Sequence, residues 1–177
     1  MTSARLFISV DIPKNIAEEI KKIQEQLPEF KGKKTETENL HLTLKFLGYV
    51  EEKKLNEIKK NLKKIKSKKF DTVISEIGVF PPYQVRIVWL KMGGVENLQR
   101  EIDDSLKDLF EEERRFMGHL TIARVKSVED RKAFLEELKK IKIPPDFGFE
   151  VKNFKLKKST LSSKGPVYEA IEEYGLA

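Results

Sequence analysis

Residues 38–48 read Glu-Asn-Leu-His-Leu-Thr-Leu-Lys-Phe-Leu-Gly, and apolar and polar side chains alternate along most of this stretch. Successive residues of a β-strand point to opposite faces of a sheet. The alternation therefore predicts a half-buried strand over Asn39–Gly48. Its apolar face would consist of Leu40, Leu42, Leu44 and Phe46. Its polar face would consist of His41, Thr43 and Lys45.

The stretch Gly118–Lys126 repeats this pattern and contains the other histidine of the chain, in the sequence His119-Leu120-Thr121. Residues two apart on a strand share a face, so each copy would offer one imidazole and one hydroxyl to the same surface. An imidazole with an ordinary pKa of about 6.5 gains and loses protons near neutral pH, and a threonine hydroxyl can donate a hydrogen bond to a phosphate oxygen. Two such pairs facing each other fit phosphoester cleavage by acid-base catalysis without a metal ion.

A single His-x-Thr is weak evidence, because a histidine on the polar face of a strand is more often a solvated or hydrogen-bonded spectator. A duplicated strand could also be kept for packing alone. Packing would account for the repeated leucines but not for a histidine and a threonine on the opposite face each time. The matched copies therefore favour a catalytic role.

The elements around each motif follow a similar order of strand, helix and strand. Hydrophobic periodicity predicts helices over 12–27, 55–65, 95–109 and from Ser127 or Asp130 to about Lys140. Further strands are predicted over 6–11, 70–80, 85–91, 147–152, 154–161 and 167–172. The polar residues from Lys31 to Glu38 are expected to form a loop.

The duplicated order predicts one α+β domain over residues 1–177, because no long Gly/Ser linker separates the halves. The two halves, approximately residues 1–80 and 81–177, would form similar lobes with helices on the outer faces of their sheets.

The composition excludes several kinds of chemistry. With no cysteine, thiolate catalysis, iron–sulfur clusters, disulfides and the usual structural zinc sites are ruled out. Lys and Arg exceed Asp and Glu by 35 to 29, and the net charge of +6 is compatible with an anionic partner. No apolar run of about 18 residues and no secretory signal is found, so an intracellular protein is expected. Abundant Lys and Glu are typical of proteins from hot-living organisms.

Five stretches together resemble a known family. They are Arg5–Pro13, residues 38–48, Arg86–Trp89, residues 118–125 and Gly165–Glu169. In this ordered set the chain resembles the 2H phosphoesterases, and within them the RNA 2′,3′-cyclic phosphodiesterases, also called 2′-5′ RNA ligases or LigT/ThpR-like proteins. There are two departures. Members usually have Pro and Thr-Pro shortly before the two histidine motifs, where this chain has Thr37 and Met117-Gly118.

The resemblance implies a bilobal fold of antiparallel sheet with pseudo-twofold symmetry, exchanged terminal strands and a central cleft that holds both motifs. It implies hydrolysis of 2′,3′-cyclic phosphate ends of RNA to 2′-phosphates with no metal and no cofactor. It also implies reversible, ATP-independent 2′-5′ joining of tRNA halves. His41 would be the acid and His119 the base, while Thr43 and Thr121 would bind the phosphate. A cytoplasmic monomer that acts on RNA 3′ ends, without a membrane, is expected.

Four further residues are candidates for substrate binding. Lys45 shares the strand face of His41, which favours the cleft. Arg124 could clamp a phosphate through its guanidinium group, although its strand parity is opposite to that of His119. Tyr83 and Phe116 could stack on a terminal base.

Two other functions stay open at this point. One is a catalytically silent RNA-binding module that keeps the cleft as an anion pocket. The other is a phosphodiesterase of small cyclic-phosphate metabolites, which would share the chemistry.

Overall fold

The first strand, β1 (Ser3–Asp11), buries the apolar residues Leu6, Ile8 and Val10, as their alternation predicts. The structure is a computed structural model that describes residues 2–177. Four α-helices follow along the chain: α1 (Lys14–Glu25), α2 (Glu52–Lys63), α3 (Glu96–Ser105) and α4 (Arg131–Lys139). The other strands are β2 (Lys31–Lys34), β3 (His41–Glu51), β4 (Phe70–Phe80), β5 (Ile87–Gly93), β6 (His119–Ser127), β7 (Gly148–Val151), β8 (Asn153–Ser162) and β9 (Gly165–Gly175).

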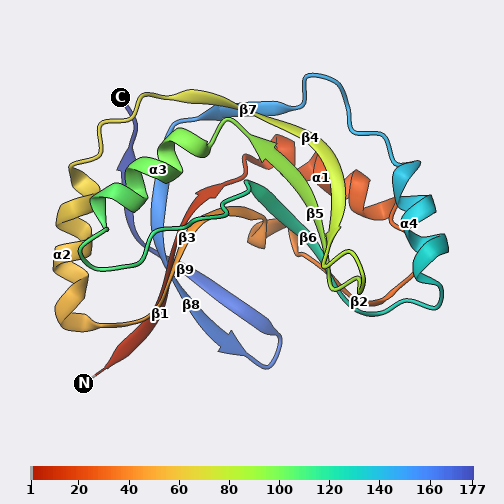
Figure 1. Cartoon of the computed structure of the whole chain (residues 1–177), viewed down its shortest axis with the longest axis horizontal. Helices are drawn as coiled ribbons and strands as arrows, with labels where there is room; N and C mark the ends of the chain where they lie inside the picture. The colour runs from red at the N-terminus through yellow and green to blue at the C-terminus, as the bar shows by residue number, and fades with distance from the viewer. Residues whose placement is uncertain (1) are drawn as a thin grey trace.

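The strands form one sheet in the order β7-β4-β5-β6-β3-β1-β8-β9, with β2 paired to β6, and the paired strands are antiparallel. This sheet curls into a half-barrel (Figure 1). We call β3, β1, β8 and β9 the first half-sheet, and β7, β4, β5, β6 and β2 the second half-sheet. Each half-sheet contains one of the two His-Leu-Thr strands, and the predicted α+β class with antiparallel sheet is confirmed.

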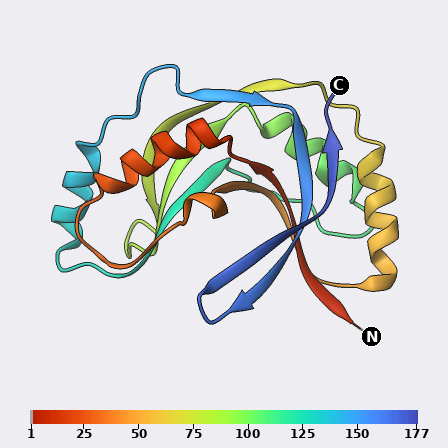
Figure 2. The same ribbon diagram turned by 180° about the vertical axis from the view of Figure 1, so that it is seen from behind.

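The two half-sheets do not coincide with the two halves of the sequence. Strand β4 precedes residue 81 but pairs with β5 and β7, whereas β8 and β9 pair onto β1. The helices cross over as well, since α1 contacts β6 and α3 contacts β3. A division at residue 80 therefore does not follow the sheet, because hydrophobic periodicity marks an element without naming its partner. The crossing of early and late segments is visible from both sides of the molecule (Figures 1 and 2).

The expected loop from Lys31 to Glu38 is wrong in part. Its first four residues form β2, which pairs with residues 123–127 of β6, and a short 3-10 helix, η1 (Thr37–Asn39), follows. The sequence Lys-Gly-Lys-Lys has no apolar alternation, and all four residues are exposed. Its strand conformation comes from backbone pairing with β6, which local side-chain pattern does not reveal.

Helix boundaries agree with local chemistry. Asp130 caps α4, because its carboxylate accepts a hydrogen bond from the backbone N–H of Ala133 at 3.1 Å. The apolar stripe of α1 consists of Ile16, Ile20 and Ile23, and all three are buried. Within residues 2–177, no helix combines the length and the apolar character needed to cross a membrane.

Candidate active site

Strands β3 and β6 lie next to each other, with Leu42 paired to Leu120, and they place both His-Leu-Thr motifs at one cavity. The two leucines are fully buried, so His41, Thr43, His119 and Thr121 face the other way and line this cavity of about 410 Å³. This volume lies in the range of small-molecule binding sites. The structure therefore brings together the four residues that the sequence predicts to be catalytic.

Both imidazole rings are held in the same manner. The Nδ1 atom of His41 lies 2.7 Å from the backbone carbonyl oxygen of Asn39, and Nδ1 of His119 lies 2.9 Å from that of Met117. A carbonyl oxygen only accepts, so Nδ1 carries the hydrogen in each ring. The Nε2 atom is then a proton acceptor when the ring is neutral and a proton donor when the ring is charged. This geometry suits either role in acid-base catalysis.

One of the residues that departs from the family pattern, Met117, provides the acceptor for His119. This acceptor is a backbone carbonyl, which any residue type supplies. The backbone around Gly118 leaves no room for a side chain. A Cβ atom on Gly118 would lie 2.2 Å from the carbonyl oxygen of Met92, whose backbone N–H donates a hydrogen bond to the carbonyl oxygen of Gly118. Glycine therefore lets β6 approach β5 just before His119.

Aromatic rings pack against both histidines. The ring of His41 lies edge-on to Tyr168 and tilted against Phe7, with centroids 5.0 and 5.2 Å away. The ring of His119 lies edge-on to Phe80 at 5.3 Å. Such contacts limit the rotation of the rings.

The pKa of His41 is lowered to about 4, chiefly because burial disfavours the charged ring. The hydrogen bond to Asn39 and the charge of Asp11 oppose this effect, while the positive charges of Lys157 and Arg124 add to it. At neutral pH the ring of the ligand-free protein is therefore uncharged. An anion bound in the cavity would counter both the burial and the neighbouring cations.

Each motif strand contains a β-bulge immediately after its threonine. The pairing of β3 with β1 skips Leu44, and the pairing of β6 with β5 skips Ile122. An extra residue inverts the alternation of side chains beyond it. As a result Phe46 and Arg124, each three residues after the motif threonine, both line the cavity. Arg124, a predicted substrate-binding residue, therefore lies at the cavity although its strand parity is opposite to that of His119.

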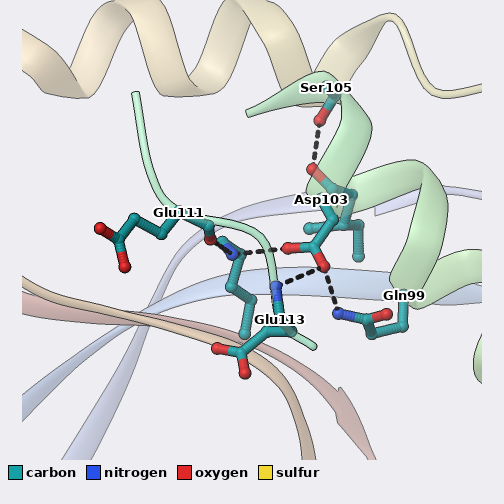
Figure 3. A network of polar contacts seen from close by, with 7 residues as sticks. Gln99, Asp103, Ser105, Glu111 and Glu113 are labelled. Atoms are coloured by element: carbon teal, nitrogen blue, oxygen red, sulfur yellow. Dashed lines mark hydrogen bonds and ion pairs between the residues drawn. The ribbon is translucent and has the colours of Figure 1, made fainter. Parts of the chain in front are cut away.

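The same bulge makes the prediction for Lys45 wrong. Lys45 is 3% exposed and does not line the cavity. Its Nζ donates to Oδ1 of Asp103 on α3 at 2.5 Å and to the carbonyl oxygen of Glu111 at 2.7 Å. The other oxygen of Asp103 accepts from Gln99 Nε2 at 2.9 Å and from the backbone N–H of Glu113 at 3.0 Å (Figure 3). Lys45 thus belongs to a buried network behind the site.

The two aromatic candidates do not line the cavity either. Tyr83 is 76% exposed, in the turn between β4 and β5. Phe116 is half-buried and packs against the hydrophobic core. The stacking role predicted for these residues is therefore wrong for this cavity.

Several residues of the cavity wall were not among the predicted site residues. Arg5, Lys33, Lys34, Glu36, Phe46 and Tyr168 line it. Arg5 and Tyr168 lie in stretches that resemble the family, and Phe46 has a further signal. In the second motif, Ile122 and Ala123 are adjacent apolar residues that break the alternation, which indicates a bulge. Transferring that bulge to the first motif would have placed Phe46 in the cleft.

A curled antiparallel sheet with two His-Leu-Thr strands at one cavity defines the class of two-histidine phosphoesterases. The chain belongs to the family described as LigT like phosphoesterases, whose model matches residues 10–89 and 92–168. A relative from Methanocaldococcus jannaschii, named RNA 2′,3′-cyclic phosphodiesterase, is 45% identical over 181 residues, covering 96% of this chain and 99% of that protein. The family resemblance in the sequence is thereby confirmed.

Solved structures show the same fold. A crystal structure of a protein of Thermus thermophilus matches with a TM-score of 0.82 and 25% identity, covering 97% of each chain. The crystal structure of E. coli LigT complexed with 3′-AMP matches with a TM-score of 0.80 and 24% identity, covering 99% of each chain.

Proposed function

We propose that this protein hydrolyses 2′,3′-cyclic phosphate ends of RNA to 2′-phosphates, using His41 and His119 for proton transfer. The observation that carries the proposal is the cavity itself, where two imidazoles with identical backbone hydrogen bonds lie beside two threonine hydroxyls. The name of the relative from Methanocaldococcus jannaschii, which is similar along the whole chain, supports the same reaction.

In the proposed reaction a water molecule attacks the phosphorus atom and loses a proton to Nε2 of His119. The bond between phosphorus and the 3′ oxygen breaks, and the 3′ oxygen receives a proton from Nε2 of His41. Thr43 and Thr121 donate hydrogen bonds to the non-bridging oxygens, where negative charge builds up in the transition state. The guanidinium group of Arg124, which also lines the cavity, adds electrostatic stabilisation.

The lowered pKa of His41 shapes this assignment. The ring is neutral in the ligand-free protein at neutral pH. A phosphate anion beside the ring stabilises its charged form, so we propose that His41 takes up its proton when substrate binds. The acid role of His41 therefore depends on occupancy of the cavity by an anion.

The test uses His41→Ala and His119→Ala with adenosine 2′,3′-cyclic phosphate as substrate. We expect each variant to lose about 10²–10⁴-fold in kcat, because each loses one positioned proton-transfer group. The wild-type rate should not change when EDTA is added. Circular dichroism spectra of both variants should match that of the wild type. Turnover at the wild-type rate by either folded variant would overturn the proposal.

The same variants assign the two roles when the 3′ bridging oxygen of the substrate is replaced by sulfur. A thiolate leaves without protonation, so the variant that lacks the acid regains activity on this substrate. We expect this recovery for His41→Ala and not for His119→Ala. Recovery of His119→Ala instead would reverse the assignment.

We include 2′-5′ joining in the proposal, because an RNA 5′-hydroxyl can replace water as the nucleophile with the same two proton transfers. Both motifs come from one chain, so we propose that a monomer is active. We propose that halves of tRNA that carry a cyclic phosphate and a 5′-hydroxyl are substrates, and that the protein acts on them in the cytoplasm. Incubating such halves without ATP and probing the junction for a 2′-5′ bond tests this part.

A further inference from the structure

The cavity carries more positive charge than one reacting phosphate requires. Four cationic side chains line it, those of Arg5, Lys33, Lys34 and Arg124, against the single carboxylate of Glu36. A cyclic phosphodiester has one negative charge. Arg124 lies close enough to His41 to lower the pKa of that ring, so it belongs to the catalytic end. The other three cations need a different explanation.

Arg5 lies far along β1 from the catalytic residues. Ser9 of β1 is paired with Thr43, and Arg5 is four residues earlier on the same strand. At about 3.3 Å per residue the two positions are separated by about 13 Å along β1. Arg5 is paired on its other side with Ser159 of β8, three residues before the β8 strand ends at the hairpin turn. The cavity therefore extends from the histidines towards the β8–β9 hairpin.

Lys33 of β2 reaches the same hairpin. Its Nζ donates to the carbonyl oxygen of Lys164 in the turn at 3.2 Å and lies 2.8 Å from Oε1 of Glu36. Since β2 belongs to the second half-sheet and the hairpin to the first, this contact connects the two half-sheets beside the cavity. Arg5 and Lys33 thus lie on the hairpin side of the cavity, and Lys34 follows Lys33 on β2 and also lines the cavity.

The present partners of Lys33 are easily replaced. The side chains of Lys33 and Glu36 are 56% and 43% exposed, and ion pairs of this kind are weak in water. The pKa of the Glu36 carboxyl is lowered, mainly by the hydrogen bond from Lys33, so this carboxylate is charged at neutral pH. The Glu36 carboxylate therefore holds the Lys33 ammonium group at the cavity wall, and another anionic group could take its place.

Resting on the proposed function, we propose that Lys33, Lys34 and Arg5 form a subsite for the phosphate that precedes the terminal nucleotide of an RNA chain. This subsite selects oligonucleotide ends over mononucleotide cyclic phosphates. In the ligand-free protein Glu36 forms an ion pair with Lys33, and the RNA phosphate displaces the Glu36 carboxylate when it binds.

The experiment compares three substrates, each ending in a 2′,3′-cyclic phosphate. They are the mononucleotide, the dinucleotide ApA, and the same dinucleotide with an uncharged methylphosphonate linkage. The variant is Lys33→Ala. The matched control is Lys31→Ala, because Lys31 is an exposed lysine of the same strand that lines a separate groove beside α4 and not this cavity.

For the wild type we expect a lower KM for the charged dinucleotide than for the other two substrates. Lys33→Ala should raise the KM of the charged dinucleotide about fivefold more than that of the other two, with similar kcat. It should also reduce the slope of log KM against log salt by about 0.7, as expected for loss of one single-strand phosphate contact. Lys31→Ala should leave the KM ratios as in the wild type.

Glu36→Gln gives an independent check, because it removes the competing carboxylate and keeps the side-chain shape. We expect it to lower the KM of the charged dinucleotide and to leave that of the methylphosphonate unchanged. A rise in KM with Lys33→Ala that is equal for charged and uncharged dinucleotides would overturn the subsite. Equal wild-type KM values for mononucleotide and dinucleotide would do so as well.

Failure of the proposed function gives a different result. In that case the wild type turns over none of the three substrates. The subsite is then decided by calorimetry with ApA carrying a 3′-phosphate, where tighter binding by the wild type than by Lys33→Ala supports it and equal binding refutes it.

Discussion

At the scale of single residues, the two histidines form equivalent hydrogen bonds to backbone carbonyls but differ in their surroundings. His41 packs against two aromatic rings and lies near Lys157, which is itself ion-paired with Asp11. Burial tends to raise the pKa of Asp11, but the hydrogen bonds from Lys155 and Lys157 outweigh it and lower that pKa. The neighbouring carboxylate is therefore largely neutralised, and it does little to stabilise a charged His41.

This environment predicts a pH-dependent stability. The pKa of His41 is about 4 in the folded protein and about 6.5 in an unfolded chain. Its contribution to stability is therefore fully present above about pH 6.5 and is lost as the pH falls through about 4. We expect the wild type to lose about 2–3 kcal/mol relative to His41→Gln between pH 7 and pH 4.5. Urea denaturation at both pH values measures this difference, and parallel losses would contradict it.

At the scale of elements, the β-bulge decides which side chains of β3 and β6 reach the cavity. Beyond it, Lys45 turns into the protein and joins β3 to α3 through Asp103. Asp103 also holds the loop after α3 through the backbone of Glu113 (Figure 3). That loop leads directly to Met117, whose carbonyl orients His119. The buried network therefore connects the first motif strand with the approach to the second.

Removing one partner of the ion pair between Lys45 and Asp103 should destabilise the folded protein. Lys45→Met leaves the buried Asp103 carboxylate without its cation, and we expect a loss of about 3–5 kcal/mol in the free energy of unfolding. Lys45→Met combined with Asp103→Asn should be more stable than Lys45→Met alone. The asparagine keeps an acceptor for Gln99 and Glu113 but removes the charge. Urea denaturation compares the proteins, and a loss below about 1 kcal/mol for the single variant would count against a buried ion pair.

At the scale of the whole molecule, the two half-sheets meet along a short line of contact. Pairing between β3 and β6 is confined to Leu42 and Leu120 among the described residues, while α1 and α3 each cross to the opposite half-sheet. Both leucines are fully buried in one continuous core. The position of one histidine relative to the other therefore depends on shared packing and not on a long hydrogen-bonded ladder.

This arrangement predicts a single cooperative unfolding transition. Trp89 is the only tryptophan of the chain and lies in β5 of the second half-sheet, so its fluorescence reports on that half. We expect fluorescence and far-UV circular dichroism to give the same denaturation midpoint. Leu42→Ala and Leu120→Ala should each cost about 2–5 kcal/mol while both probes still coincide. Separate midpoints for the two probes would show that the halves unfold independently.

The sequence by itself determined the α+β class, the helices and most strands, because hydrophobic periodicity is a local property of the chain. It also determined the four central side chains, since a histidine and a threonine two residues apart share a strand face before any bulge intervenes. Only the tertiary structure decided the fates of Lys45, Phe46 and Arg124, because a bulge depends on the register with a partner strand. The same holds for β2 and for the contact of Lys33 with the Lys164 carbonyl, since pairing and contact between distant segments are not encoded in the local alternation of side chains.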